Sequence, residues 1–211
     1  EQGLMLTGAK PVYMLPSRNR YGIIGPIYPQ EMQPETLQKK INESPLTKDK
    51  AGQKPSYCVV TNCTYDGVCY NAKEAQDLLE KTSDRLHFDE AWYGYARFNP
   101  IYADHYAMRG EPGDHNGPTV FATHSTHKLL NALSQASYIH VREGRGAINF
   151  SRFNQAYMMH ATTSPLYAIC ASNDVAVSMM DGNSGLSLTL EVIDEAVDFR
   201  QAMARLYTVS Y

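Results

Sequence analysis

The feature that most constrains the fold is an alternation of short apolar segments with an amphipathic helix. Residues 56–62, Ser-Tyr-Cys-Val-Val-Thr-Asn, are rich in β-branched side chains and nearly continuous in apolar character, which is typical of a strand buried on both faces. Asn71 begins a helix that runs to about Thr82. Residues 85–90 and 118–123 are predicted as further strands. This order predicts right-handed βαβ units around a mostly parallel sheet, an α/β fold.

Shorter patterns complete the expected element order. The segment Val12–Leu15 lies between two prolines and is predicted as a strand, and a helix is expected from Pro34 to about Glu43. Towards the end of the chain we expect a strand over 136–141 and helices over 149–160 and 166–180. The run Gly-Asn-Ser-Gly at 182–185 should end the second of these helices. A last helix is expected from near Thr189, and it should still be helical where the chain stops.

Composition excludes several classes of protein. Net charge is −3 and no run of Lys or Arg forms a strip, which argues against a nucleic-acid or membrane-surface partner. No apolar stretch approaches the roughly 20 residues that cross a bilayer, and the first residues do not resemble a signal peptide. The four cysteines, whose spacing fits no zinc site, are expected to be reduced thiols. A cytoplasmic location and no metal site are therefore predicted.

Two reactive groups follow neighbouring predicted strands. Asp89 ends one strand, and Ser125-Thr126-His127-Lys128 follows another. In open α/β sheets the ligand lies beyond the carboxyl ends of the strands. A single lysine there is more often a solvated loop residue, but its pairing with an aspartate matches the needs of pyridoxal phosphate. That cofactor takes a lysine amine for covalent attachment and a carboxylate that keeps its ring nitrogen protonated.

The motifs that carry these groups resemble a known family. Phe88-Asp89-Glu90-Ala91-Trp92, then Ser125-Thr126-His127-Lys128, then Tyr-Met-Met-His-Ala-Thr-Thr-Ser-Pro over 157–165 resemble the bacterial ornithine/lysine/arginine decarboxylases. These enzymes have the aspartate-aminotransferase fold, fold-type I of the pyridoxal-phosphate enzymes. The resemblance covers nearly the whole chain, and residues 89–100 are most similar to the members that act on arginine.

The resemblance implies roles for individual residues. Lys128 would bind pyridoxal 5'-phosphate covalently, and Asp89 would face the pyridine nitrogen. Ser125 and His127 would help to hold the phosphate, and His127 would also serve in proton transfer. By the same resemblance Ala91 would lie against the ring.

Other implied contacts involve the surroundings of the cofactor. Trp92 would lie beside it. Thr162, Thr163 and Ser164 match a segment that reaches the neighbouring subunit's site in such enzymes, so self-association into dimers and larger rings is implied. A carboxylate should face the substrate guanidinium, and Glu90 and Asp104 are candidates.

The implied reaction is the decarboxylation of arginine to agmatine and carbon dioxide, which consumes a proton and serves acid resistance. The same chemistry on lysine or ornithine is the runner-up, and a transaminase rests on fold kinship alone. Residues 1–211 would form a central part of the cofactor domain, with 187–211 the start of a helix leading out of it. The family's upstream phosphate-binding loop and ring-stacking histidine do not occur in this sequence. A truncated, inactive fragment is therefore the competing interpretation, and the isolated chain is expected to have little activity.

Overall fold

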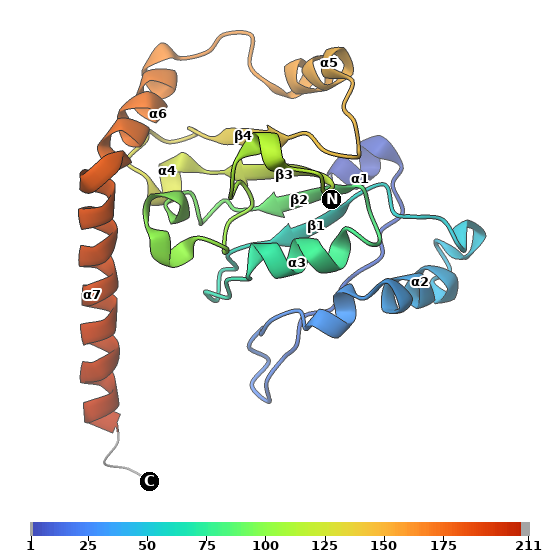
Figure 1. The fold of residues 1–211 in the computed structure, drawn as a ribbon, viewed down its shortest axis with the longest axis horizontal. Helices are drawn as coiled ribbons and strands as arrows, with labels where there is room; N and C mark the ends of the chain where they lie inside the picture. Colours follow the sequence, from blue (N-terminus) through green and yellow to red (C-terminus); the bar gives the residue numbers. More distant parts are fainter. Residues whose placement is uncertain (1, 208–211) are drawn as a thin grey trace.

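A four-stranded sheet organises the chain (Figure 1), whose structure is a computed structural model that describes residues 2–207. The strands lie in the order β1-β2-β3-β4, with bounds Cys58–Thr61, Arg85–Asp89, Thr119–His124 and Tyr138–Arg142. β1, β2 and β3 are parallel, and β4 is antiparallel to β3. This confirms the predicted α/β class and the mostly parallel sheet.

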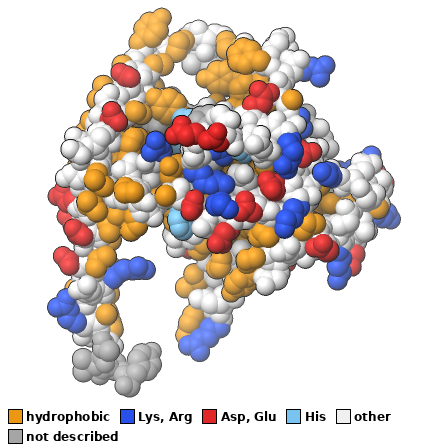
Figure 2. Space-filling model, viewed as in Figure 1, with side chains coloured by type: hydrophobic (Ala, Val, Ile, Leu, Met, Phe, Trp, Pro, Cys, Tyr) orange, Lys and Arg blue, Asp and Glu red, His pale blue; other side chains and the backbone are white. Residues whose placement is uncertain are grey.

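Helices surround the sheet and continue beyond it. The α-helices are α1 Gln2–Thr7, α2 Pro34–Glu43, α3 Ala72–Leu79, α4 Thr126–Leu129, α5 Phe150–His160, α6 Tyr167–Met180 and α7 Gly182–Tyr207. Short 3-10 turns are η1 Pro29–Met32, η2 Lys48–Lys50, η3 Ala96–Phe98, η4 Pro100–Tyr102 and η5 Pro112–Asp114. Figure 1 shows α3 below the sheet, α5 above β4, and α7 extending away from the body. In the same view, Figure 2 shows hydrophobic side chains gathered over the first half of α7, where Leu188, Leu190 and Val192 are exposed.

The core lies between α3 and one face of the sheet. Its buried members from these elements are Val60, Ala72, Ala75, Leu79, Leu86, Phe88, Val120 and Ala122. The helix begins where predicted because the Asn71 side chain accepts a hydrogen bond from the Glu74 backbone N–H at 3.0 Å. Its alanines and leucine then fall on the face turned to the strands.

The prediction that residues 56–62 form a strand buried on both faces is wrong in its burial. Along β1 the residues alternate between buried and exposed, and Val59 is 43% exposed. On the same face of the sheet Ile139 and Val141 of β4 are 41% and 37% exposed. Phe153 of α5 stacks on Phe121 at 6.3 Å between ring centroids, so α5 covers part of this face. The apolar pattern therefore marks a face that the described residues only partly cover.

The expected strand at Val12–Leu15 does not form. Its backbone is engaged by side chains instead of by a neighbouring strand. The Leu15 N–H donates to Glu31 Oε2 at 2.8 Å, and the Tyr13 carbonyl accepts from Lys40 Nζ at 3.0 Å. Among the described residues, no strand pairs with this segment.

The glycine run at 182–185 does not separate two helices by a loop. α6 ends at Met180, and α7 begins at Gly182, whose φ is +61°. The last helix therefore begins seven residues before Thr189, the expected start, and also before residue 187, where the helix leading out of the domain was expected to begin. A Cβ on Gly185 would lie 1.8 Å from the Met180 carbonyl oxygen, so this glycine permits the helices to meet closely. The expected helical character of 208–211 lies outside the described residues.

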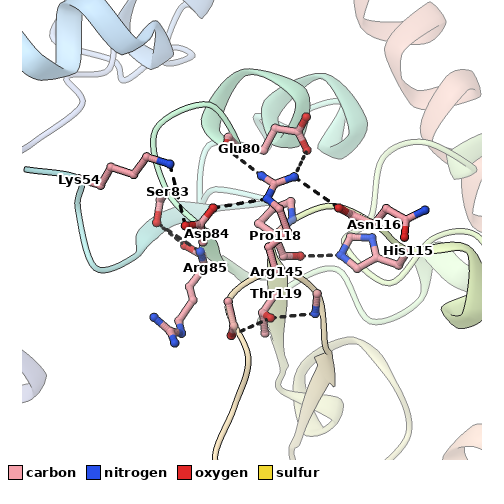
Figure 3. Close-up of polar contacts among 12 residues, drawn as sticks. Lys54, Glu80, Ser83, Asp84, Arg85, His115, Asn116, Pro118, Thr119 and Arg145 are labelled. Atoms are coloured by element: carbon pink, nitrogen blue, oxygen red, sulfur yellow. Dashed lines mark hydrogen bonds and ion pairs between the residues drawn. The ribbon is translucent and has the colours of Figure 1, made fainter.

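A polar cluster closes the amino ends of β2 and β3 (Figure 3). Arg145 donates to the Glu80 carbonyl at 3.0 Å and to Asp84 Oδ1 at 3.4 Å. Thr119 Oγ1 donates to the Gly146 carbonyl at 2.9 Å. These bonds attach the segment after β4 to the strand edge opposite the one that carries Asp89.

Candidate functional site

The carboxyl edge of the parallel strands brings the predicted reactive groups together. Asp89 is the last residue of β2 and pairs in register with Thr123 of β3. β3 ends one residue later, at His124, and the chain enters α4, which contains Lys128. Two segments that are distant in sequence thus end side by side, as the rule for parallel sheets requires.

Lys128 lies above an aromatic ring at this edge. Its Nζ is 4.8 Å from the centroid of the Trp92 ring, within the range of a cation–π contact. Lys128 is exposed, and its backbone N–H donates to the Ser125 carbonyl at 2.9 Å. Trp92 is held in turn by the edge of Tyr65, with ring centroids 5.2 Å apart. The amine is accessible, and the Trp92 ring lies beside it.

Asp89 is half-buried and keeps one oxygen available. Oδ1 accepts a hydrogen bond from the Ala91 N–H at 3.2 Å, whereas no hydrogen bond within residues 2–207 involves Oδ2. His87 lies two residues earlier on the same face, and its Nε2 is 3.2 Å from Thr123 Oγ1. Burial lowers the pKa of His87, and the Asp89 charge acts in the opposite direction. A neutral imidazole therefore lies near a carboxylate that has a free acceptor.

Ser125 and His127 provide a hydroxyl and an imidazole next to the amine. His127 uses Nδ1 to donate to the Ala136 carbonyl at 2.8 Å, which leaves Nε2 on the other side of the ring. The Ser125 side chain makes no capping bond to α4. An exposed lysine, an aspartate with a free oxygen, a small residue at Ala91 and these polar groups fit the donor set that pyridoxal phosphate needs.

Thr162, Thr163 and Ser164 are not part of this edge. They are exposed and lie between α5 and α6, in the segment that Figure 1 draws as an arch away from α4. The Ser164 N–H donates to Thr162 Oγ1 at 3.1 Å. Their assignment to a neighbouring subunit's site stays a prediction.

Glu90 is excluded as the partner of a substrate guanidinium. It is fully buried, and both of its carboxylate oxygens have partners inside the protein: Oε1 accepts from Asn62 Nδ2 and the Ala107 N–H, and Oε2 pairs with His124 Nε2. Asp104 is exposed. The sequence did not predict the buried contact between Glu90 and His124. The signal that pointed to it is the pair of acids, Asp89 and Glu90, at the end of a predicted strand.

The structure also bears on histidines and cysteines as metal ligands or nucleophiles. His124 bonds Glu90 and His127 bonds a carbonyl, and within residues 2–207 no three His, Cys, Asp or Glu side chains gather as they would around a metal ion. The four cysteines are free, and burial raises the pKa of Cys63 to about 12, which disfavours a nucleophilic thiolate. Among the described helices, none is both long and apolar enough to cross a membrane.

The fold and site define a class that comparison with known proteins identifies. Residues 1–211 match the family described as Orn/Lys/Arg decarboxylase, major domain, and the chain belongs to this family. It is 99% identical over 207 residues to the biodegradative arginine decarboxylase of Escherichia coli strain K12, covering 98% of this chain and 27% of that protein.

Lysine decarboxylases of the same family are more distant. The chain is 50% identical over 204 residues to lysine decarboxylase LdcA of Pseudomonas aeruginosa, covering 96% of this chain and 27% of that protein. The solved structure of lysine decarboxylase A from Pseudomonas aeruginosa superposes with a TM-score of 0.87 at 48% identity, covering 98% of this chain and 28% of that one. The chain therefore spans about a quarter of the length of the relatives it matches.

Proposed function

We propose that residues 1–211 form part of the cofactor domain of a pyridoxal-phosphate-dependent decarboxylase that converts arginine to agmatine and carbon dioxide. The observation that carries the proposal is the position of the Lys128 amine over Trp92, at the strand edge where Asp89 has one carboxylate oxygen without a hydrogen bond among residues 2–207. Membership of the decarboxylase family supports the reaction class.

Each residue at the edge has a defined task in this proposal. Lys128 holds the cofactor covalently, and Asp89 keeps the pyridine nitrogen protonated through its charge. Ser125 and His127 bind the phosphate, and Nε2 of His127 is available to move a proton because Nδ1 is bonded to Ala136. The bound cofactor supplies an electron sink for the pair released when the Cα–carboxylate bond breaks.

Arginine is favoured over lysine and ornithine as the substrate. The 99% identity to an arginine decarboxylase compares with 50% to a lysine decarboxylase and 35% to the constitutive ornithine decarboxylase of Escherichia coli. Each turnover replaces a carboxylate by a proton, so the reaction would consume acid and serve acid resistance. Assembly into dimers and larger rings in the cytoplasm belongs to the same proposal, with Thr162, Thr163 and Ser164 reaching a second subunit.

Trapping the cofactor tests the central assignment. In the full-length Escherichia coli relative, the bound cofactor is reduced with borohydride and the labelled peptide is identified by mass spectrometry. We expect the label on the lysine that matches Lys128, and a K128R variant should lose it. A K73R variant is the matched control, because Lys73 lies on α3 and pairs with Asp77 at 2.6 Å. Label on any other lysine in the parent protein would overturn the assignment.

A further inference from the structure

A row of three polar side chains lies directly behind the proposed site. Asn62 follows β1, Glu90 follows β2, and His124 ends β3. Alternation along a strand places Glu90 on the face of Phe88, which is buried, and Asp89 on the opposite face. The row therefore spans the carboxyl ends of the three parallel strands on the side away from Asp89.

Glu90 is the centre of this row. Its Oε1 accepts from Asn62 Nδ2 at 2.9 Å and from the Ala107 N–H at 2.8 Å, and its Oε2 lies 3.0 Å from His124 Nε2. Asn62 is fully buried as well and extends the row, because its Oδ1 accepts from the Tyr70 N–H at 3.0 Å. One carboxylate thus connects three strand ends and the loop at Ala107.

The Glu90 side chain is 0% exposed, and burying a carboxylate has an unfavourable desolvation free energy. Burying a charge is unfavourable unless every oxygen is paired, and apolar residues of similar size often stabilise a fold equally well. Charge-assisted hydrogen bonds, however, fix direction and distance more tightly than apolar contacts do. The arrangement is suited to holding the strand ends in one relative position.

The groups so fixed are those that carry the proposed reaction. The peptide at Asp89 is held on both sides, because its carbonyl accepts from the Asn62 N–H at 2.8 Å and the next N–H, that of Glu90, donates to the Thr123 carbonyl at 3.0 Å. His124 directly precedes Ser125 and the turn that carries Lys128. A shift of Glu90 or His124 would change the separation of the Asp89 carboxylate and the Lys128 amine.

We propose that Glu90 is a positioning residue of the decarboxylase site: its buried carboxylate, bonded to Asn62 and His124, sets the relative placement of Asp89 and Lys128. The inference rests on the proposed function, since it concerns the geometry that the cofactor meets. Glu90 touches neither cofactor nor substrate in this assignment, so its loss should lower kcat and leave KM nearly unchanged.

The test uses the full-length Escherichia coli relative with substitutions at the matching positions. E90A removes the acceptor of the Ala107 N–H, of His124 Nε2 and of one Asn62 Nδ2 hydrogen, while Asn62 Nδ2 keeps its bond to the His105 carbonyl at 2.8 Å. A displacement of about 1 Å at a reacting group can reduce the rate about 100-fold. We expect kcat to fall by about that factor, with KM changed less than about threefold. E111A, at an exposed glutamate, is the matched control and should retain the parent kcat.

His124 provides a second pair of variants in case E90A does not fold. H124F removes the donor to Glu90 Oε2, whereas H124Q retains one; we expect kcat to fall about tenfold in H124F and to stay within about threefold in H124Q. Thermal unfolding midpoints are recorded for all variants, and assays are run well below them. Equal kcat in H124F and H124Q, or parental kcat in a folded E90A, would overturn the positioning role.

Borohydride mapping of the parent separates the two proposals. Label at the position of Lys128 together with unchanged kcat in E90A and H124F refutes only the role of Glu90. Label on a different lysine refutes the proposed site itself, and the positioning role with it. Label on Lys128 with the expected kcat losses supports both.

Discussion

Replacing Asp89 by asparagine removes the charge of this residue and preserves its shape. Oδ1 of the asparagine can still accept from the Ala91 N–H, which Asp89 does at 3.2 Å. The residue is half-buried and makes no ion pair within residues 2–207, so the substitution should change the free energy of unfolding by no more than about 1 kcal/mol. The fold is therefore expected to persist while the electrostatics of the site change.

The expected effect on catalysis follows from the free oxygen Oδ2. An adjacent carboxylate typically shifts the pKa of a cationic group by about 1–3 units, and one unit corresponds to about 1.4 kcal/mol. If the cofactor ring depends on that charge, loss of the charge raises the barrier by about 1.4–4 kcal/mol. We thus expect kcat to fall by about 10- to 1000-fold in D89N.

The assay measures agmatine formation by the full-length Escherichia coli relative that carries the substitution, with cofactor occupancy determined in parallel. D89N should retain part of its cofactor binding because Lys128 is unchanged. D66N, at an exposed loop position, serves as the charge-matched control. Turnover by D89N close to that of D66N would refute the claim that Asp89 acts on the ring nitrogen.

Two further perturbations test the fold by urea denaturation. In Gly144→Ala the added Cβ would lie 2.3 Å from the Gly117 carbonyl oxygen, so we expect destabilisation of about 1–3 kcal/mol. In the control Gly113→Ala the added Cβ meets no atom within 4 Å, so its stability should be nearly that of the parent. Equal urea midpoints for the two variants would contradict this expectation. Burial lowers the pKa of His87 and of His140, so below about pH 6.5 the unfolded chain binds more protons than the folded chain. The free energy of unfolding is therefore highest above about pH 6.5 and decreases as pH falls from there towards the folded pKa values. The urea midpoint should be lower at about pH 5 than at about pH 7.5, and an H140Q variant should show a smaller difference; an unchanged difference would argue against a neutral His140.

The strands and α3 could be predicted because local signals agree there with the tertiary structure. A β-branched run at 56–62, the cap at Asn71 and the apolar run at 118–123 each specify one element, β1, α3 and β3, and the strands follow their chain order in the sheet. Burial could not be predicted in the same way. Apolar side chains indicate that a face favours burial, but Val59 is 43% exposed, so the described residues cover this face only in part.

The structure of residues 182–185 and of Val12–Leu15 was also predicted wrongly, because it depends on contacts between segments. Gly182 and Gly185 predict a loop on propensity alone, but close approach to Met180 makes the second glycine a requirement of helix packing. The unpaired segment at Val12–Leu15 depends on bonds from Glu31 and Lys40, which no local pattern encodes.

The candidate site was partly accessible from sequence. The carboxyl-end rule for parallel sheets brings Asp89 and Lys128 to one edge without knowledge of any contact. Two contacts could not be predicted, because they depend on side-chain directions that only the folded chain defines. They are the position of the Trp92 ring below the Lys128 amine and the pairing of Glu90 with His124, 34 residues away.

Two kinds of constraint alternate over the five consecutive residues 86–90, in β2 and directly after it. Leu86, Phe88 and Glu90 point into the interior, whereas His87 and Asp89 point to the other face. A saturation mutagenesis of this stretch should therefore give a tolerance profile with a period of two. Substitutions at Leu86 and Phe88 would change the abundance of the folded enzyme, and substitutions at Asp89 would change turnover per molecule. Glu90 would change both, because it is buried and is proposed to position the site. Neighbouring residues of this stretch would thus accept different substitutions, because selection for a stable fold acts on one and selection for turnover acts on the next.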